Sequence, residues 1–495
     1  MVGRRANSCL RRLPLAALMI AVASLPARAG AQEAVTPGPA QRESSGDAFD
    51  RTPENEPAAP PATRPKYQLT RWLEDWRALQ DPAKRTDAFD PLKYIPLDRS
   101  GQAHLTLSGQ WREELFSNDG GILSASGDTY GLHRIYLGAD LHVGQARVFA
   151  ELADTLAIGK SRPLAPTDED RLDLQLLFAD YRIDLGGGAQ LIGRVGRQEL
   201  AFDPTQRFVG TREGPNNRQA FDAVRVNLKA KGLYISAFAS RPVTYRPGAF
   251  DDPRDRDVAF RGVYVTRAGG GQTQSFYVYG YDNDAARFGA VAGRERRTAI
   301  GLRLAGRTGP FDYDVEGMRQ TGTFAGERIR AWGVGSLAGF TFTGVPWAPR
   351  LGVQADFASG DSDPADGRVG TFNPLFFKGG YFLEAPISSF ANVRHLKGSL
   401  SVKPGKSSDF SLAYGDFAKL SLADALYANP LVALAPTHSM RGRRVGGYLQ
   451  LVGSRKFGPH FSLSFEGDRF RRSQSFADVG GRDVSLLKVT ANFLF

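Results

Sequence analysis

Polar and apolar residues alternate along this chain from residue 103 to its last residue, Phe495. The alternation is clear in residues 104–112, 298–304 and 489–495. Successive side chains of a β-strand point to opposite faces, so this pattern predicts half-buried strands. The alternation continues over more residues than in an ordinary soluble β-sandwich. After residue 26, no apolar stretch approaches the roughly 20 residues that a membrane-spanning helix needs. The predicted fold class is therefore all-β.

The connections between the expected strands are alternately short and long. Tight turns at one end and long polar loops at the other are typical of outer-membrane barrels. Closing the barrel pairs every backbone group within the lipid. We expect a transmembrane antiparallel β-barrel of eighteen strands over residues 103–495, with both chain ends in the periplasm. Strand centres are expected near residues 109, 136, 150, 178, 194, 225, 236, 262, 277, 301, 314, 335, 353, 397, 411, 449, 465 and 489, and long loops near 117–129, 156–171, 201–220, 242–257, 283–296, 320–328, 360–390, 417–442 and 473–482.

The first 31 residues have the pattern of a secretory signal peptide. A segment with four arginines precedes an apolar run, and Ala29-Gly30-Ala31 matches a cleavage site. Removing five arginines and no acid lowers the net charge from +11 to +6, which is too small on this length to indicate nucleic-acid binding. The single cysteine, Cys9, lies in this segment. The mature chain therefore has no disulfide, thiolate metal site or cysteine nucleophile.

Two segments separate the signal peptide from the barrel. Residues 32–66 are rich in proline, which predicts a disordered linker. Residues 67–102 contain Trp72, Trp76 and Tyr94, which need a surface to bury against, so we expect a periplasmic arm or plug segment that contacts the barrel. The chain ends on an alternating strand with Phe495. A terminal aromatic of this kind resembles the signature that the outer-membrane assembly machinery recognises.

Three blocks of sequence resemble the alginate-export family of outer-membrane porins. The first, which begins at Val195, contains VGRQEL, QRFVGTREGPNNR and FDAVR, and its residues 197–225 are the most specific part; residues 90–97 and 360–376 are also similar. The resemblance runs from about residue 67 to residue 495. It implies an eighteen-stranded barrel with an arginine-lined passage for an anionic polysaccharide.

The alternation also predicts which charges face the lumen. An arginine fork binds carboxylates in a bidentate manner and stays charged, but luminal charges in barrels usually pair and brace the wall. Residues 194 and 197 fall on opposite faces of a regular strand unless a bulge lets both enter. If the loop at 201–220 folds inward, its arginines converge with those of the wall. The candidate pore-lining residues are Arg112, Arg134, Arg147, Arg194, Arg197, Arg207, Arg212, Arg218, Arg225 and Arg303, with Lys397 and Lys488 on the same face.

Other site motifs are incomplete. The acidic run Asp361–Gly367 has its third acid one position late for an EF-hand and Phe372 in place of the final Glu. The six histidines form no H-E-x-x-H motif. We expect no catalytic residues, metal site or cofactor.

The predicted function is passive passage of anionic solutes through the outer membrane of a Gram-negative bacterium, with an alginate-like polyuronate as the leading exported cargo. The expected partners are outer-membrane lipid and the anionic polysaccharide or small anionic solute. Uptake of small organic or aromatic acids is an alternative within transport. An outer-membrane hydrolase and a structural or adhesive barrel are alternatives of other classes.

Overall fold

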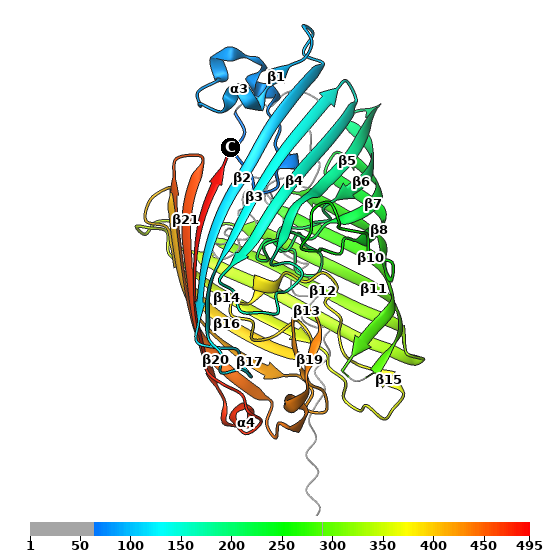
Figure 1. Ribbon diagram of the computed structural model, residues 1–495, viewed down its shortest axis with the longest axis vertical. Coiled ribbons are helices and arrows are strands. Elements are labelled where there is room, and N and C mark those ends of the chain that lie inside the picture. The colour runs from blue at the N-terminus through cyan, green and yellow to red at the C-terminus, as the bar shows by residue number, and fades with distance from the viewer. Residues whose placement is uncertain (1–63, 290) are drawn as a thin grey trace, which may run out of the picture.

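The computed structural model describes residues 64–289 and 291–495. These residues form a closed antiparallel barrel of eighteen strands (Figure 1). The last strand, β22, pairs with the first, β2, from Gln110↔Leu494 to Asn118↔Leu486, so the sheet has no open edge. The expected signal peptide, 1–31, and residues 32–63 of the expected linker lie outside the described residues.

The barrel strands follow one another around the wall in chain order. They are β2 (Ala103–Asn118), β3 (Asp128–Val143), β4 (Ala146–Ile158), β5 (Asp170–Gly186), β6 (Ala189–Gln198), β7 (Phe221–Ala230), β8 (Leu233–Pro242), β9 (Val258–Gly269), β10 (Gln272–Phe288), β11 (Val291–Thr308), β12 (Phe311–Phe324), β13 (Glu327–Thr341), β14 (Arg350–Ala358), β16 (Val393–Val402), β17 (Ser408–Lys419), β20 (Arg444–Phe457), β21 (Phe461–Arg472) and β22 (Val484–Leu494).

Every expected strand centre falls inside one of these strands, but two expected loops do not exist. Residues 283–296 and 320–328, predicted as long loops, mostly continue the strands: β10 and β11 remain paired to Phe288↔Val291, and β12 and β13 to Phe324↔Glu327. The prediction was wrong because these hairpins are polar on both faces, as in the run Arg294–Arg297. Without an apolar face, the alternation that identifies a strand disappears.

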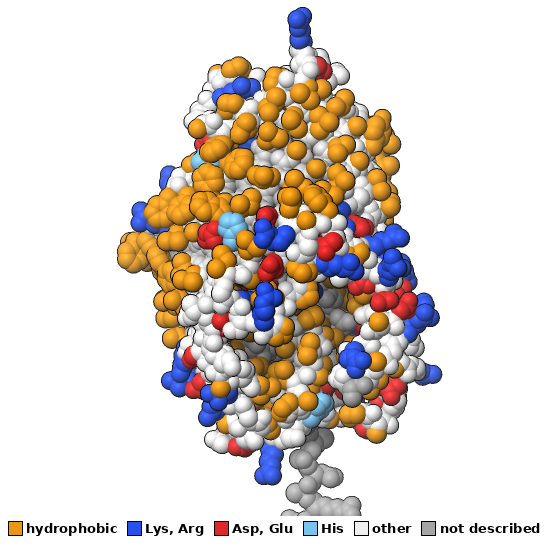
Figure 2. Space-filling model, in the orientation of Figure 1, with side chains coloured by type: hydrophobic (Ala, Val, Ile, Leu, Met, Phe, Trp, Pro, Cys, Tyr) orange, Lys and Arg blue, Asp and Glu red, His pale blue; other side chains and the backbone are white. Residues whose placement is uncertain are grey.

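The outer face of the wall is apolar, whereas the inward face carries buried charged side chains together with a large cluster of buried aromatic ones, among them Phe221, Phe238 and Phe260. On β7, Arg225 is 1% exposed, whereas its neighbour Val224 is 58% exposed. On β2, Arg112 is 3% exposed and Trp111 is 54% exposed. In Figure 2, apolar side chains cover much of the upper part of this face, and charged side chains gather lower down. This is the polarity expected of a barrel whose outer surface contacts lipid.

Short turns connect the strands at one end, and the C-terminus lies there together with α3 (Asp90–Lys93) and β1 (Ile95–Pro96) (Figure 1, top). The β5–β6 turn at this end is Gly186-Gly187-Gly188, and all three residues have positive φ, which glycine adopts without strain. Long loops, with α4 (Gln474–Ala477) and the hairpin of β18 (Leu426–Ala428) and β19 (Val432–Leu434), lie at the opposite end. No helix among residues 64–289 and 291–495 is long and apolar enough to cross a membrane.

Smaller elements lie in the N-terminal arm and in the long loops. β1 extends the sheet by pairing with β2. These elements are the 3-10 helices η2 (Arg71–Leu73), η3 (Arg77–Gln80) and η4 (Pro82–Lys84), α3 (Asp90–Lys93), β1 (Ile95–Pro96), β15 (Arg368–Val369), η5 (Gly379–Tyr381), β18 (Leu426–Ala428), β19 (Val432–Leu434), η6 (Ala435–Ser439) and α4 (Gln474–Ala477).

Candidate functional site

The inward face of the wall carries six of the ten candidate arginines. They come from β2, β3, β4, β6, β7 and β11, and each is at least nine-tenths buried inside the barrel. Successive side chains of a strand point to opposite faces. The neighbours of these arginines on each strand therefore point outward and are more exposed. The six arginines are Arg112, Arg134, Arg147, Arg194, Arg225 and Arg303.

Arg194 and Arg197 lie on opposite faces of β6. The Nε atom of Arg197 is 3.0 Å from Oδ1 of Asp222, which lies between the inward residues Phe221 and Ala223 of β7. Gly196, between the two arginines, has φ +124°, and a Cβ there would come within 2.2 Å of the Leu177 carbonyl oxygen, so only glycine fits. Arg197 therefore braces the outer face at the long-loop end of β6.

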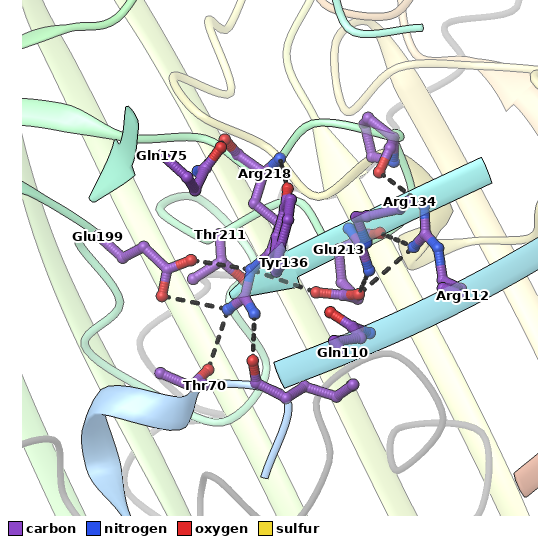
Figure 3. Close-up of polar contacts among 12 residues, drawn as sticks. Thr70, Gln110, Arg112, Arg134, Tyr136, Gln175, Glu199, Thr211, Glu213 and Arg218 are labelled. Carbon is purple, nitrogen blue, oxygen red and sulfur yellow. Dashed lines mark hydrogen bonds and ion pairs between the residues drawn. The ribbon is translucent and has the colours of Figure 1, made fainter. Parts of the chain in front are cut away.

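The loop at 199–220 folds into the barrel and meets the arginines of β2 and β3 (Figure 3). The carboxylate of Glu213 accepts from Arg112 at 3.3 Å and from Arg134, and Arg218 of the same loop lies 3.2 Å from its other oxygen. Burial alone would raise the pKa of Glu213, but the charges of Arg134, Arg218 and Arg112 outweigh it and lower this pKa to about 2. Glu213 is thus a fixed anion that holds three cations.

The N-terminal arm enters the lumen from the short-turn end. Its Arg71 is 2.6 Å from Glu151 of β4, and the indole N–H of Trp72 donates to Glu199 at 2.9 Å. Arg218 donates to the Thr70 hydroxyl at 3.0 Å. Sequence reasoning predicted an arm or plug segment but could not predict this depth of contact, because Trp72 and Glu199 are 127 residues apart.

The arm also covers two wall arginines. Arg147 donates to the backbone carbonyl of Trp72 at 2.6 Å and to Asp140 at 2.7 Å. The guanidinium of Arg194 lies 4.6 Å from the centre of the Trp72 ring, in cation–π geometry, and its Nε is 2.6 Å from Asp180. Both arginines are therefore occupied by protein groups while the arm is in place.

The same loop reaches a distant part of the wall. Arg207 pairs with Glu316 of β12 at 2.8 Å and donates to the Tyr381 hydroxyl, also at 2.8 Å. Arg303 of β11 pairs with Asp314, which is 3.4 Å from Arg207. The loop 199–220 therefore spans the lumen from β2 and β3 to β12, and it touches the long loop 359–392 through Tyr381.

Arg212 and Arg225 have neutral hydrogen-bond acceptors. Arg212 donates to Gln219 at 3.4 Å and lies 5.8 Å from the ring of Phe376. Burial lowers its pKa to about 10. Arg225 donates to the hydroxyls of Ser236 and Tyr234, each at 2.8 Å. The other eight candidate arginines each form an ion pair with a carboxylate.

A cavity of about 380 Å³ remains in the lumen beside these inserted segments. It extends from the short-turn end to the loop residues Lys378–Glu384, along β13, β14, β16, β20, β21 and β22. Eight of its lining side chains are cationic and five are acidic. The cations are Lys66, Arg112, Arg350, Lys378, Lys397, Lys406, Lys456 and Lys488, and the acids are Glu114, Glu213, Glu384, Asp409 and Glu466.

Five of the cavity cations were not among the candidates from the sequence: Lys66, Arg350, Lys378, Lys406 and Lys456. Lys378 is the one of the five that is buried. It lies in the loop 359–392, where alternation gives no facing, whereas the inward facing of Lys397 and Lys488 follows from their strands. Burial lowers the pKa of Lys378 to about 8, against the raising effect of Glu384 and other carboxylates. No signal in the sequence distinguishes this lysine from other loop lysines.

Comparisons with known proteins agree with this architecture. The sequence profile of the family described as Alginate export matches residues 102–484. No curated protein is similar in sequence to the chain. Solved structures with a similar fold include OccK8 (OprE) of Pseudomonas aeruginosa, with 13% identity and TM-score 0.53, covering 79% of this chain and 98% of that one. The outer membrane protein opdK of the same organism has 11% identity and TM-score 0.54, with the same coverage of both chains. OccK2 (OpdF), also from Pseudomonas aeruginosa, has 12% identity and TM-score 0.54, covering 79% and 97%.

Proposed function

This chain belongs to the alginate export family of Gram-negative outer-membrane barrels, and we propose that it is a channel for the passive passage of anionic solutes. The leading cargo is a polyuronate that leaves the cell. The family supports transport in place of catalysis. The arm then lies in the periplasm, the apolar outer face contacts outer-membrane lipid, and the terminal strand is recognised by the assembly machinery.

The observation that carries the proposal is the charge of the cavity wall. Its lining has eight cations against five acids. In a narrow space with low-dielectric walls, fixed charges of one sign concentrate mobile ions of the other sign. By this effect, rings of charged side chains determine whether a pore prefers anions or cations. The lysine side chains of β16, β22 and the loop 359–392 are the groups that a passing carboxylate would meet.

We assign two roles to the luminal arginines. Seven of them form ion pairs, fix the arm and the loop 199–220 against the wall and contribute to the positive potential of the lumen, whereas Arg197 braces the outer face. Arg212, which forms no ion pair among the described residues, keeps more of its field for a solute. Removing a paired arginine would leave a buried carboxylate without its partner, which is costly, so these residues are unsuitable for testing selectivity.

A second candidate function is the uptake of small organic or aromatic acids. The cavity volume of about 380 Å³ lies within the roughly 300–1,000 Å³ of small-ligand sites. A small acid would therefore fit without displacement of the arm or loops. A polymer needs a continuous passage, so its export requires the arm to leave the lumen.

Current block in planar bilayers tests the cargo. The full-length protein is exposed to uronate oligomers and to neutral oligosaccharides of equal length. Polyuronate export predicts block by the anionic oligomer at a concentration about tenfold lower, since several carboxylates meet the lysines together. Equal block by both oligomers would contradict an anionic cargo. Permeation by small carboxylates without any block by oligomers would favour the second candidate.

A further inference from the structure

Three aspartates from two separate segments converge at the long-loop end of the barrel. Asp170 is the first residue of β5, and Asp173 lies three residues further along it. Asp252 belongs to the loop 243–257, which joins β8 to β9. One carboxylate oxygen from each residue can be chosen so that all three lie within 4.8 Å of one another. None of the three residues lines the cavity of about 380 Å³.

Asp170 is buried, and one of its oxygens is unsatisfied. The residue is 1% exposed, and its Oδ1 atom has no hydrogen-bond partner in the part of the chain that the structure describes. A buried carboxylate oxygen normally accepts at least one hydrogen bond or coordinates a metal. This orphan atom is a second observation, independent of the clustering, and it points to a bound cation or to a proton shared with a neighbouring carboxyl.

Among the described residues, none of the three carboxylates forms an ion pair with Lys or Arg. The guanidinium of Arg197 pairs with Asp222 and donates to the backbone carbonyl of Asp252 at 2.9 Å. Asp173 Oδ2 accepts the backbone N–H groups of Asp251 and Asp252 at 2.8 and 3.2 Å. Three close carboxylates cannot all stay ionised unless a cation joins them.

We propose that Asp170, Asp173 and Asp252 bind a calcium ion that fastens the loop 243–257 to the start of β5. Carboxylate oxygens are hard donors, which suit Ca²⁺ and Mg²⁺. Ca²⁺ takes oxygens at about 2.3–2.6 Å, so ligands on opposite sides of it lie roughly 4.6–5.2 Å apart, which accommodates the observed spread. Mg²⁺ keeps several waters and commonly takes one or two carboxylates, so three carboxylates favour Ca²⁺. The site is independent of the proposed transport.

Calorimetry on the detergent-solubilised full-length protein tests the site. The protein is stripped with a chelator and titrated with CaCl2 alone. The expected result is about one Ca²⁺ per chain, at least tenfold weaker binding in Asp170→Asn and in Asp252→Asn, and weaker binding of Mg²⁺. Asp363→Asn, in the exposed part of the loop 359–392, is the matched control and should bind as the wild type does. Heat-modified mobility on a gel checks that each variant is folded.

Limited trypsin digestion of the wild type gives a result that needs no variant. Trypsin can cut the loop 243–257 after Arg254 and Arg256, whereas Arg246 is followed by Pro247 and is not a cleavage site. Ca²⁺ should slow cleavage after Arg254 and Arg256 at least fivefold relative to the chelator. Three results would overturn the proposal: no Ca²⁺ binding by the wild type, unchanged affinity in Asp170→Asn, or cleavage that ignores Ca²⁺. The carboxyls would then share protons in place of a metal.

Discussion

At the residue scale, the interior of this barrel is held by carboxylates that each neutralise more than one arginine. Glu213 contacts Arg112, Arg134 and Arg218, and Asp314 contacts Arg207 and Arg303. Sequence alternation predicted which wall arginines face inward, since facing is a local property of a strand. It could not predict their partners, because Glu213 and Arg112 meet only when a loop 101 residues away folds inward.

Replacing Glu213 should destabilise the inserted loop. Glu213→Gln leaves three buried guanidinium groups without their shared anion, and breaking a buried pair of this kind costs about 3–5 kcal/mol. The urea midpoint of unfolding should fall, and protease should cut the loop 199–220 more readily. The control is Glu113→Gln, which replaces the acid next to Arg112 on the outer face of β2 and should change the midpoint little. An unchanged midpoint in Glu213→Gln would show that the loop is held by other contacts.

The lowered pKa of Glu213 makes the strength of its ion pairs with the three arginines depend on pH. Its ordinary value is 4.5 and its folded value is about 2. An acid whose pKa is lower in the folded state stabilises that state fully at pH values above its unfolded pKa. This contribution is lost as the pH falls toward the folded pKa. The difference in unfolding free energy between wild type and Glu213→Gln should therefore be constant from pH 7 to 5 and shrink between about pH 4.5 and pH 2. A difference that stayed constant down to pH 2 would contradict this assignment.

At the element scale, the strands were predictable and the inserted segments were not. Alternation predicted the location of all eighteen barrel strands, and it failed at the β10–β11 and β12–β13 hairpins, where Arg294–Arg297 and their neighbours make both faces polar. For the arm, residues 64–80, the sequence predicted only that its aromatic side chains are buried. Nothing local in its sequence specifies that Trp72 packs against Phe178 and Arg194, because those partners belong to strands that the arm meets only in the closed barrel.

Deleting the arm should open the lumen. Without residues 64–80, Arg147, Arg194 and Arg218 lose their contacts with Trp72, Leu69 and Thr70 and face solvent. Single-channel conductance should rise at least twofold, since conductance follows the free cross-section of the passage. Deletion of residues 32–63 is the control, and the barrel should assemble and conduct as the wild type does. Equal conductance in both deletions would mean that the arm does not obstruct the passage.

At the scale of the whole molecule, the barrel combines an apolar outer face, a lumen lined by charged and aromatic side chains, and three segments that enter it. The arm, the loop 199–220 and the loop 359–392 leave a cavity beside β13–β22 with an excess of cations. Lys378 tunes this charge, because its pKa of about 8 makes it cationic at neutral pH and neutral in mildly alkaline solution. Anion preference should therefore weaken between pH 7 and 9, and this pH dependence should vanish in Lys378→Gln.

The reversal potential of a single channel in a KCl gradient tests anion selectivity most directly. The wild type should show the sign of an anion-selective pore, with a smaller magnitude at high salt because screening shortens the range of the fixed charges. The double variant Lys378→Gln/Lys397→Gln should reduce the magnitude of the reversal potential severalfold. The control Lys231→Gln, in an exposed turn between β7 and β8, should leave the potential unchanged. A cation-selective or unselective wild-type channel would contradict the account.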